Sequence, residues 1–442
     1  MSLKRTIFDV KNATVLHSSG AMFRQLMRDQ FLDPDDLERL QAERAIRHAR
    51  FAMQHTRFYR DRYTAAGFTL ADLDDPAAFS ELPIIEKSEV RNDPAAFRSS
   101  EATDRNSKAT VTGGSTGEPL RLLRDLRTPT RAIEWRMWDW WGIHPADDIA
   151  IIVRHVRSAD EDRLHNLQWW PSKRFQLDAH HISDASVAEF VELWRAVKPA
   201  LLMGYVGGVA DVSRRVRSLA VNVPPPRAVG VTAAPLTPAL RLTIEEAFHS
   251  PVYDTYRSAE VPWMAGECAA HDGLHTFADV RKVEVVNDAG RQVIAGELGQ
   301  TVVTDLTNRV FPIIRYRIGD VTTPIDGLCS CGVTLPRIRP VSGRVSDAMR
   351  LPDGQSVAGE ALTMAFSITP EAVRQFQIHQ QSDYSIVIRC VPGDGANAKE
   401  EIDLAVDRFR NLMDHRVPVS LEIVEQIAHD GGKIRYIKSD VV

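Results

Sequence analysis

Between residues 149 and 256, short apolar runs alternate with amphipathic segments, and this alternation constrains the fold more than any other feature of the chain. The runs IAIIVRHV, LLMGYV, AVGVTAAPL and PVYDTY have the apolar, partly β-branched composition of buried strands. The segments between them carry apolar residues at helical spacing. Strands that alternate with helices are typical of a layered α/β domain, in which helices cover a sheet. We therefore predict such a domain.

Two of the intervening helices have recognisable ends. The first is expected to begin near Ser183 or Asp184 and to stop before Pro199. Its apolar stripe consists of Val187, Phe190, Val191, Trp194 and Val197. The second opens with Thr237-Pro238, the favoured order of a capping residue followed by proline. It is expected to bury Leu240, Ile244 and Phe248.

The chain divides into segments of different character. With 442 residues, it is too long for one ordinary core. The first hundred residues are rich in helix formers. Beyond Gly343, the strand-like segments RQFQIH, YSIVIRCV and VSLEIV, with a helix over about 399–413, suggest a small α+β unit. We predict a large N-terminal domain over 1–343 and a small C-terminal domain over 344–442, with the boundary at 343–347.

Composition excludes several classes of protein. The formal net charge is −5, and basic residues are scattered among acidic ones, so nucleic-acid binding is not expected. No run approaches the roughly 18 apolar residues of a spanning helix. The N-terminal segment has neither an apolar region nor a cleavage site of a secretory signal. A cytoplasmic location and no membrane partner are therefore expected.

The most informative motif is VTGGSTGEPL, at 111–120. Its glycines allow backbone N–H groups to approach a phosphate, and its hydroxyl groups add uncharged donors. It lacks the Lys-Ser/Thr pair that closes a Walker A loop. Taken alone, the motif is equally compatible with a surface turn. The candidate phosphate-binding residues are Thr112, Gly113, Gly114, Ser115, Thr116 and Gly117.

Two further polar motifs follow later in the chain. In IIRYRIGD, Gly319 turns the chain and presents Asp320, a carboxylate suited to accept hydrogen bonds from a ribose diol. Taken alone, this segment is more typical of an edge strand with a solvated basic face. In HDGGKIRY, two glycines precede Lys433 on a short loop that could carry a cation to a distant site. A lone Gly-Gly-Lys is more often an exposed loop.

In this order, the three motifs resemble those of the adenylate-forming superfamily of acyl-CoA ligases, luciferases and adenylation domains. The phenylacetate-CoA ligase group, with its relatives from polysaccharide clusters, is the branch that the chain resembles most. RFYRDRYTAAGF, FSELPIIEKSEVR, VTAAPLTP, YDTYRSAE and GRVSD are also similar to segments of that branch. The resemblance runs nearly from end to end. It implies ATP, Mg²⁺ and coenzyme A as cofactors, and a small C-terminal domain that is mobile.

The resemblance also assigns roles. Lys433 would be catalytic, reaching the carboxylate and the α-phosphate, and Glu260 would help to bind Mg²⁺. Asp320 would bind the ribose hydroxyls, with Arg344 near the ribose and phosphate. The residues expected around the adenine are Ala233, Ala234, Asp254, Thr255 and Tyr256, of which Tyr256 would stack on the ring. The residues expected at the acyl group are Gly204, Tyr205 and Thr232.

Four positions depart from the pattern of this branch. Glu118 stands where the phosphate loop usually has lysine, which removes a cation from that loop. Arg257 stands where glycine usually follows the stacking tyrosine, and Ala259 precedes the glutamate in place of Ser, Thr or Arg. Ser346 replaces an aspartate common at the hinge. Since Glu260, Asp320 and Lys433 are present, adenylation is still expected, while the shape of the acyl pocket is left open.

The cysteines suggest a structural zinc site. Cys268 and His271 form one closely spaced pair, and Cys329 and Cys331 form another. Three thiolates and one imidazole are a common tetrahedral set for zinc. His275 is an alternative fourth ligand, and free buried thiols are the alternative to a metal site. Cys390 is expected to be an ordinary buried thiol.

The acid and its acceptor are less constrained. WRMWDWWG and QWWPSK concentrate the tryptophans, which fits a protein core better than a ligand pocket, although an aromatic acid would suit such surroundings. Coenzyme A is the expected acceptor, and an amine, hydroxyl or carrier-protein thiol is the alternative. A third interpretation is a non-catalytic nucleotide-binding descendant, which the presence of Lys433 and Glu260 disfavours. A homodimer is compatible with all three.

Overall fold

The computed structural model describes residues 3–111, 120–153, 156–179, 181–341, 343–344, 349–352, 356–357, 366, 372–393, 397–413, 415–427 and 437–441. The chain forms two compact units. The first consists of Arg5–Trp141 with Thr255–Pro340, and the second consists mainly of Gly142–Asp254 with Val341–Val442. The predicted domains 1–343 and 344–442 stay a prediction.

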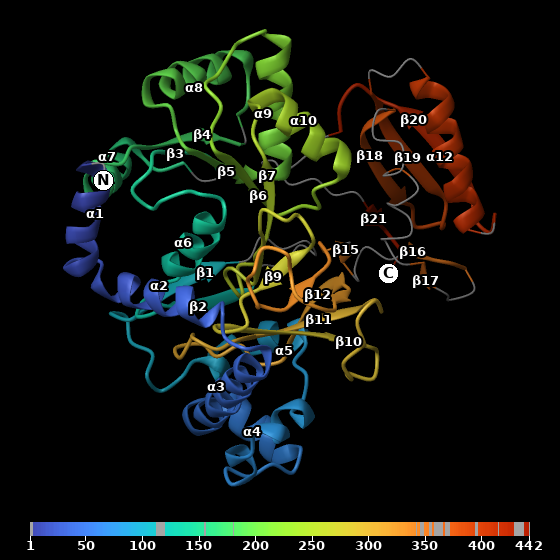
Figure 1. The fold of residues 1–442 in the computed structure, drawn as a ribbon. Coiled ribbons are helices and arrows are strands. Elements are labelled where there is room, and N and C mark those ends of the chain that lie inside the picture. Colours follow the sequence, from blue (N-terminus) through green and yellow to red (C-terminus); the bar gives the residue numbers. More distant parts are fainter. Residues whose placement is uncertain are drawn as a thin grey trace. The chain divides into compact units, whose positions relative to one another are not determined.

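The first unit begins with the predicted helical segment, shown in blue in Figure 1. Its longest helix, α3, starts because Asp33 caps it, accepting a hydrogen bond from the Asp35 N–H at 3.0 Å, and because Pro34 occupies the first turn. The helices of this unit are α1 (Leu3–Ala13), α2 (His17–Asp29), α3 (Pro34–His55), α4 (Arg57–Ala65), α5 (Lys87–Asn92) and α6 (Arg131–Trp140), with 3-10 turns at Asp72–Asp74, Pro76–Glu81 and Pro94–Phe97.

Three groups of strands complete the first unit. The first is the antiparallel hairpin β1 (Ser107–Val111) and β2 (Arg121–Asp125). The second is the antiparallel sheet β10 (Arg281–Val286), β11 (Gly299–Asp305) and β12 (Tyr316–Thr322). The third is a run of short antiparallel strands in the order β13 (Pro324–Ile325), β14 (Arg337–Ile338), β9 (Leu274–Thr276) and β8 (Ala265–Glu267), beside the end of β7 (Val252–Tyr256).

The tryptophans of α6 belong to the core of the first unit. Trp135, Trp138 and Trp141 are buried, and the Trp135 ring makes edge contacts with Phe8 and Phe23 at centroid distances of 5.2 and 5.9 Å. This placement confirms that the WRMWDWWG cluster is mainly core. These rings therefore do not support an aromatic-lined ligand pocket.

The second unit contains the predicted alternation of strands and helices. Its parallel strands run in the order β4, β3, β5, β6, and in Figure 1 α8, α9 and α10 lie beside them. The bounds are β3 (Ile149–Val153), α7 (Ala159–Trp169), β4 (Arg174–Asp178), α8 (Asp184–Val197), β5 (Leu201–Tyr205), α9 (Val206–Ser218), β6 (Ala228–Thr232) and α10 (Pro238–Phe248). The predicted layered α/β class is confirmed.

The predicted helix ends are confirmed as well. Ser183 caps α8 by accepting a hydrogen bond from the Ser186 N–H at 3.1 Å. Thr237 caps α10 through the Leu240 N–H at 3.3 Å, and Pro238 follows it. The predicted apolar stripe of α8 is buried except Val197, which is half-buried at the last turn.

The C-terminal segment has the predicted α+β character. Strand β18 pairs antiparallel with β19, and β20 and β21 flank this pair in parallel orientation. The described elements are β15 (Gly343–Arg344), β16 (Met349–Arg350), β17 (Ser356–Val357), β18 (Val373–Gln380), β19 (Ile386–Pro392), α12 (Ala398–Leu412), β20 (Val419–Ile423) and β21 (Ile437–Ser439).

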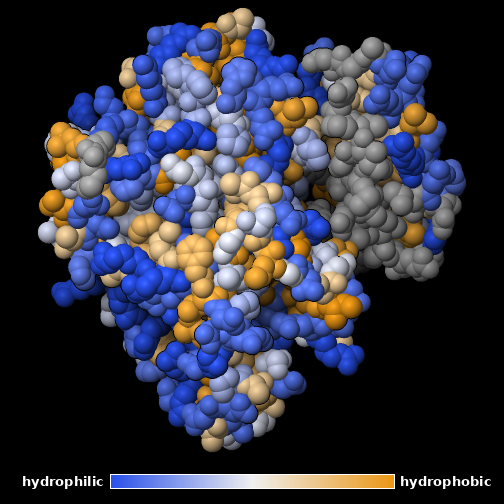
Figure 2. Space-filling model, in the orientation of Figure 1, coloured by the Kyte–Doolittle hydropathy of each residue, from blue (hydrophilic) through white to orange (hydrophobic). Residues whose placement is uncertain are grey.

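On the face shown in Figure 2, hydrophobic residues are scattered among hydrophilic ones over most of the described surface. Among the described residues, none of the helices combines the length and the hydropathy that a membrane span requires.

Candidate active site and metal centre

Part of the predicted nucleotide site lies outside the described residues. This part comprises Lys433 and the phosphate-loop residues Thr112, Gly113, Gly114, Ser115, Thr116 and Gly117. Arg344 lies in β15, and its side chain is outside the description. The other predicted residues are described, and they fall into two groups, one in each unit.

The group in the first unit is organised by a hydrogen bond between Tyr256 and Asp320. The Tyr256 hydroxyl donates to Oδ2 of Asp320 at 2.7 Å, and both side chains are buried. Tyr256 ends β7, and Asp320 lies in β12, 64 residues later in the chain. The two predicted adenosine-binding residues therefore come together.

A bulge in β12 positions Asp320. Between the pairs Gln300–Val321 and Val302–Arg317, β12 uses four residue steps where β11 uses two. Gly319 lies in this bulge with φ +86°, a conformation that glycine adopts without steric cost. Bulges re-aim side chains, and they are frequent next to active sites. The Gly319-Asp320 pair of the predicted motif is thus a bulge that presents the carboxylate.

Glu260 makes a separate contact with β12. The Tyr316 hydroxyl is 3.5 Å from Oε1 of Glu260, which is a long contact, and Glu260 is half-buried. Tyr316 was not predicted as a site residue, although it lies between the two arginines of the IIRYRIGD motif. The first unit therefore contains two contacts between a carboxylate and a phenol, each made by a residue of β12, and carboxylates suit ribose hydroxyls and a hard cation.

The two arginines of that motif have structural contacts. Arg315 is buried, forms an ion pair with Glu284 at 3.2 Å and donates to the carbonyl of Leu82 at 2.6 Å. Arg317 pairs with Glu86 at 2.8 Å. The alternative of a solvated basic face is wrong, because the segment around residues 80–86 covers these guanidinium groups.

The group in the second unit lies at the carboxyl ends of neighbouring parallel strands. Tyr205 and Thr232 are register partners at the ends of β5 and β6, and Gly204 faces Val231. Ala233 follows β6 with φ +71°, and Asp254 is buried in β7. Ligands of open α/β sheets commonly bind at this edge. The acyl and adenine roles of these residues, and of Ala234 and Thr255, stay predictions.

Gly204 is also required by packing. A Cβ at this position would lie 2.7 Å from Cγ2 of Val209 and 3.0 Å from Cβ of Ile152. We expect Gly204→Ala to destabilise the protein by about 1–3 kcal/mol, as overpacking of a close-packed core does. Thermal unfolding followed by circular dichroism should show a midpoint lowered by several degrees. An unchanged midpoint would mean that β5 and α9 can move apart without a loss of stability.

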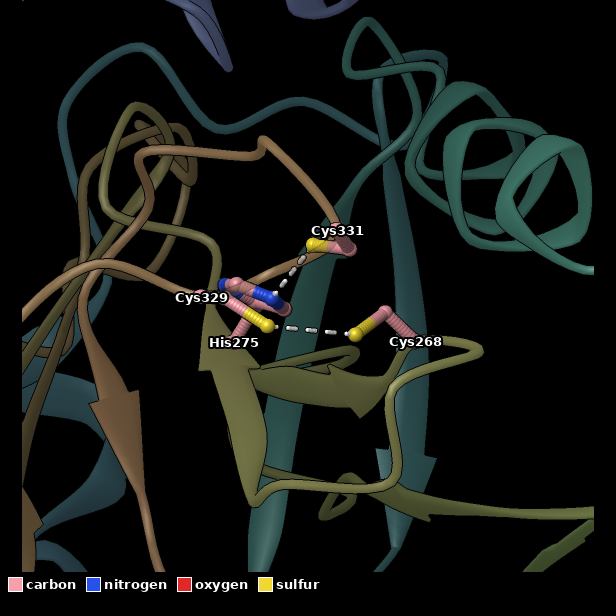
Figure 3. A group of neighbouring side chains, drawn as sticks. All are labelled: Cys268, His275, Cys329 and Cys331. Atoms are coloured by element: carbon pink, nitrogen blue, oxygen red, sulfur yellow. Dashed lines mark hydrogen bonds between the residues drawn. The ribbon is translucent and has the colours of Figure 1, made fainter.

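Three cysteines and one histidine form a compact cluster in the first unit. Cys268 follows β8, His275 lies in β9, and Cys329 and Cys331 lie in the turn between β13 and β14. Their candidate ligand atoms all lie within 4.8 Å of one another. Figure 3 shows the four side chains converging from these segments.

The spacing of the cluster fits a tetrahedral metal. Sγ of Cys268 is 3.7 Å from Sγ of Cys329, and Sγ of Cys331 is 3.4 Å from Nε2 of His275. Zinc bonds of about 2.3 Å to sulfur and 2.0–2.1 Å to nitrogen give sulfur–sulfur and sulfur–nitrogen edges of about 3.8 and 3.6 Å in a tetrahedron. Since a disulfide would require about 2.05 Å, the sulfur atoms are not covalently bonded.

The surroundings prepare His275 as a ligand. Its Nδ1 is 2.9 Å from the carbonyl oxygen of Leu335, which fixes the tautomer in which Nε2 carries the lone pair. Burial lowers the pKa of His275 and raises the pKa of Cys268 to about 12. A buried thiol of this kind ionises on binding a divalent cation, which supplies the opposite charge.

The prediction that named His271 as the fourth member of the set is corrected. His271 lies in the turn between β8 and β9 with φ +52°, and its Nδ1 is 3.1 Å from Oε1 of Glu267. The strand residue His275, the alternative that the sequence left open, takes the place beside the three thiols. Cys390 is a buried thiol in β19, as expected.

Comparisons with known proteins agree with this architecture. Residues 349–440 match the family model of the CapK C-terminal domain. The phenylacetate-coenzyme A ligase of Aromatoleum evansii is 24% identical over 343 residues, covering 71% of this chain and 72% of that protein. The corresponding ligase of Thermus thermophilus is 32% identical over 150 residues, and the match spans only about a third of each protein (33% and 34%).

Solved structures show the same fold. The crystal structure of 2-hydroxyisobutyryl-CoA ligase, in the postadenylation state with an acyl-AMP, superposes with a TM-score of 0.77 at 22% identity and covers 93% of this chain and 91% of that one. Over most of its length the chain is similar to the phenylacetate-CoA ligases and CapK-like proteins of the adenylate-forming ligase superfamily. This family has a large N-terminal α/β domain and a C-terminal domain, as the fold class predicted.

Proposed function

We propose that the protein is an adenylate-forming ligase that activates a carboxylic acid with ATP and transfers the acyl group to coenzyme A. It is an AMP-forming acid–CoA ligase. The observation that carries the proposal is the hydrogen-bonded pair of Tyr256 and Asp320, at positions that resemble the adenosine-binding motifs of the superfamily. The contact of Tyr316 with Glu260, the residue expected to bind Mg²⁺, adds to it. The phenylacetate-CoA ligase relatives support coenzyme A as the acceptor.

The first step of the proposed reaction gives each predicted site residue a role. In the first step, a carboxylate oxygen bonds to the α-phosphorus of ATP while the bond to pyrophosphate breaks. Charge develops on several phosphate oxygens, so positioning and cationic stabilisation dominate, and no protein nucleophile is needed. Asp320 would hold the ribose, Glu260 would hold Mg²⁺, and Lys433 would stabilise the reacting oxygens. The phosphate loop would hold the pyrophosphate that leaves.

The second step needs access for the acceptor. The sulfur of coenzyme A attacks the acyl carbon, its thiol proton is lost to solvent, and AMP leaves. A lysine on a mobile C-terminal domain can be withdrawn once the adenylate has formed, so that the same pocket serves both steps. The zinc of the Cys₃His site would brace the turns around β8, β9 and β14 and take no part in the chemistry.

An exchange assay with product analysis identifies the acid and the acceptor. The aromatic acid is a prediction that the buried tryptophans of α6 do not support. We propose to measure ATP–pyrophosphate exchange over a panel of carboxylic acids and then to analyse the products with and without coenzyme A. Exchange followed by an acyl-CoA product supports the proposal. If exchange occurs and coenzyme A leaves the adenylate intact, the acceptor is an amine, a hydroxyl or a carrier-protein thiol.

Tyr256→Phe tests the adenosine site. The ring that would stack on adenine remains, while the hydrogen bond to the Asp320 carboxylate is lost. Hydrogen bonds to charged groups contribute about 1.5–3 kcal/mol, so we expect the KM for ATP in the exchange reaction to rise about tenfold or more. Tyr384→Phe, in the turn between β18 and β19, serves as the control. Equal KM values in all three proteins would contradict the assignment of Tyr256 and Asp320 to ATP.

A further inference from the structure

Arg124 and Arg257 of the first unit have no carboxylate partner among the described residues, as is also true of exposed arginines such as Arg60 and Arg105. Arg124 lies in β2, and Arg257 directly follows Tyr256 at the end of β7. Within the described ranges, neither forms an ion pair. The Nε atom of Arg124 is buried and meets no described hydrogen-bond acceptor. A buried guanidinium donor without a partner is costly, unless a ligand supplies the acceptor.

The two guanidinium groups are close enough to repel each other. Burial and, next, the positive charge of Arg257 lower the pKa of Arg124. Arg257 is held in place by the ring of Trp263, whose centroid lies 4.4 Å from the guanidinium carbon. A fixed position beside a like charge is unfavourable in the free protein, and a bound anion would reverse the sign of this interaction.

A third cation lies on the same face of the hairpin. Lys108 is the direct register partner of Arg124 across β1 and β2, and it likewise forms no ion pair within the described part of the chain. Like charges placed directly opposite each other destabilise a sheet. Three cations therefore gather here without a described counter-ion, while most other arginines of this unit have carboxylate partners, such as Arg127 with Asp125 and Glu101.

The position of this cluster connects it with the nucleotide site. Arg257 is the neighbour of Tyr256, which holds Asp320. Strands β1 and β2 are joined in sequence by residues 112–119, the predicted phosphate loop.

We propose that Arg124 and Arg257, assisted by Lys108, form a subsite for an oxyanion, here called the arginine subsite. The anion is a phosphate or a carboxylate, because planar guanidinium groups recognise both through paired hydrogen bonds. It comes either from the polyphosphate of ATP or from a second acidic group on the acid that is activated. This inference rests on the proposed function and names the charge that its substrates carry.

The decisive variants are Arg257→Gly, which restores the residue usual in this branch, and Arg124→Gln. Arg257→Lys retains the positive charge, so that the effect of the charge can be separated from the effect of side-chain packing. Arg163→Gln, an exposed residue of α7, is the matched control. KM and kcat for ATP and for acids with one or two acidic groups are measured in the exchange reaction. We expect a change of about tenfold in one of these KM values, with partial recovery in Arg257→Lys.

The pattern of change identifies the source of the anion. A higher KM for ATP with every acid indicates the polyphosphate, and Glu118→Lys should then rescue Arg257→Gly by returning a cation to the loop. An unchanged KM for ATP, with a loss confined to acids that carry a second carboxylate or phosphate, indicates the acid. If both arginine variants have the same kinetic constants as the wild type and Arg163→Gln, the subsite is overturned.

A direct binding measurement separates this inference from the proposed function. If the wild-type protein exchanges pyrophosphate with no acid of the panel, the proposed function fails, and calorimetric titration with ATP, inorganic pyrophosphate and a dicarboxylate still tests the subsite. Binding of any of these that weakens about tenfold in both arginine variants supports the subsite. Affinities for all three anions that are equal in the wild type and the variants, or undetectable throughout, contradict it.

Discussion

Replacing Lys433 by alanine is expected to slow the formation of the acyl-adenylate by a factor of about 10² to 10³. Removing one preorganised group that stabilises developing charge typically costs this much. Lys433 is the cation that the superfamily's C-terminal motif would bring to the carboxylate and the α-phosphate. Its effect should therefore appear in kcat for ATP–pyrophosphate exchange, while the KM for ATP changes little, because the stabilisation is specific to the transition state.

The same variant separates the two half-reactions. Given a chemically prepared acyl-adenylate and coenzyme A, Lys433→Ala should form the thioester at close to the wild-type rate, since the proposal has the lysine withdrawn for that step. Lys438→Ala, in β21 and paired with Asp440 at 3.3 Å, is the control for a lost lysine in the same segment. Near-normal exchange by Lys433→Ala, in a protein with an unchanged melting temperature, would reject the catalytic role.

Local patterns in the sequence were sufficient to predict much of the fold. The strand and helix alternation, the caps at Ser183 and Thr237, and the elements of the C-terminal segment all depend on periodicity and on the chemistry of a few neighbouring residues. The structure confirms them because tertiary contacts reinforce these local preferences. Tyr256 and Asp320, which are predicted to bind adenosine, were found through a family motif, and the structure brings the two residues together.

Other features depend on contacts that no local pattern reveals. The burial of Arg315 depends on Leu82, 233 residues earlier, and on Glu284 in a neighbouring strand. The bulge at Gly319 is defined by register against β11 and cannot be seen in β12 alone. The pairing of Arg124 with Lys108 follows from the register of a hairpin, and the nearby Arg257 comes from a distant part of the chain.

The choice between two histidines shows the same limit in one site. Cys268 and His271 have the short spacing of many zinc ligands, so the sequence favoured His271. In the structure, His271 belongs to the β8–β9 turn, whereas His275 lies in β9 opposite Gly266 and is held by the Leu335 carbonyl. The pairing of β8 with β9 thus decides which imidazole reaches the thiols. This pairing cannot be read from either strand alone.

His275→Ala is expected to lose the bound zinc and to lower the melting temperature by roughly 5–10 °C, because structural zinc contributes directly to folding stability. Wild-type protein purified without chelators should contain about one equivalent of zinc by elemental analysis. Cys329→Ser should behave like His275→Ala, since it removes a thiolate that lies 3.7 Å from Cys268. Chelation of the wild-type protein should produce the same fall in melting temperature without any substitution.

His271→Ala provides the matched control, because it removes an imidazole four residues away, in the same hairpin and outside the cluster. It should retain zinc and melt close to the wild type, apart from the small effect of losing the contact with Glu267. Less than about half an equivalent of zinc in the wild type would count against a metal site. Zinc loss in His271→Ala, with retention in His275→Ala, would restore the ligand set that the spacing of the sequence favoured. Because both variants shorten a histidine of one hairpin to alanine, any difference between them in zinc content reports which imidazole binds the metal.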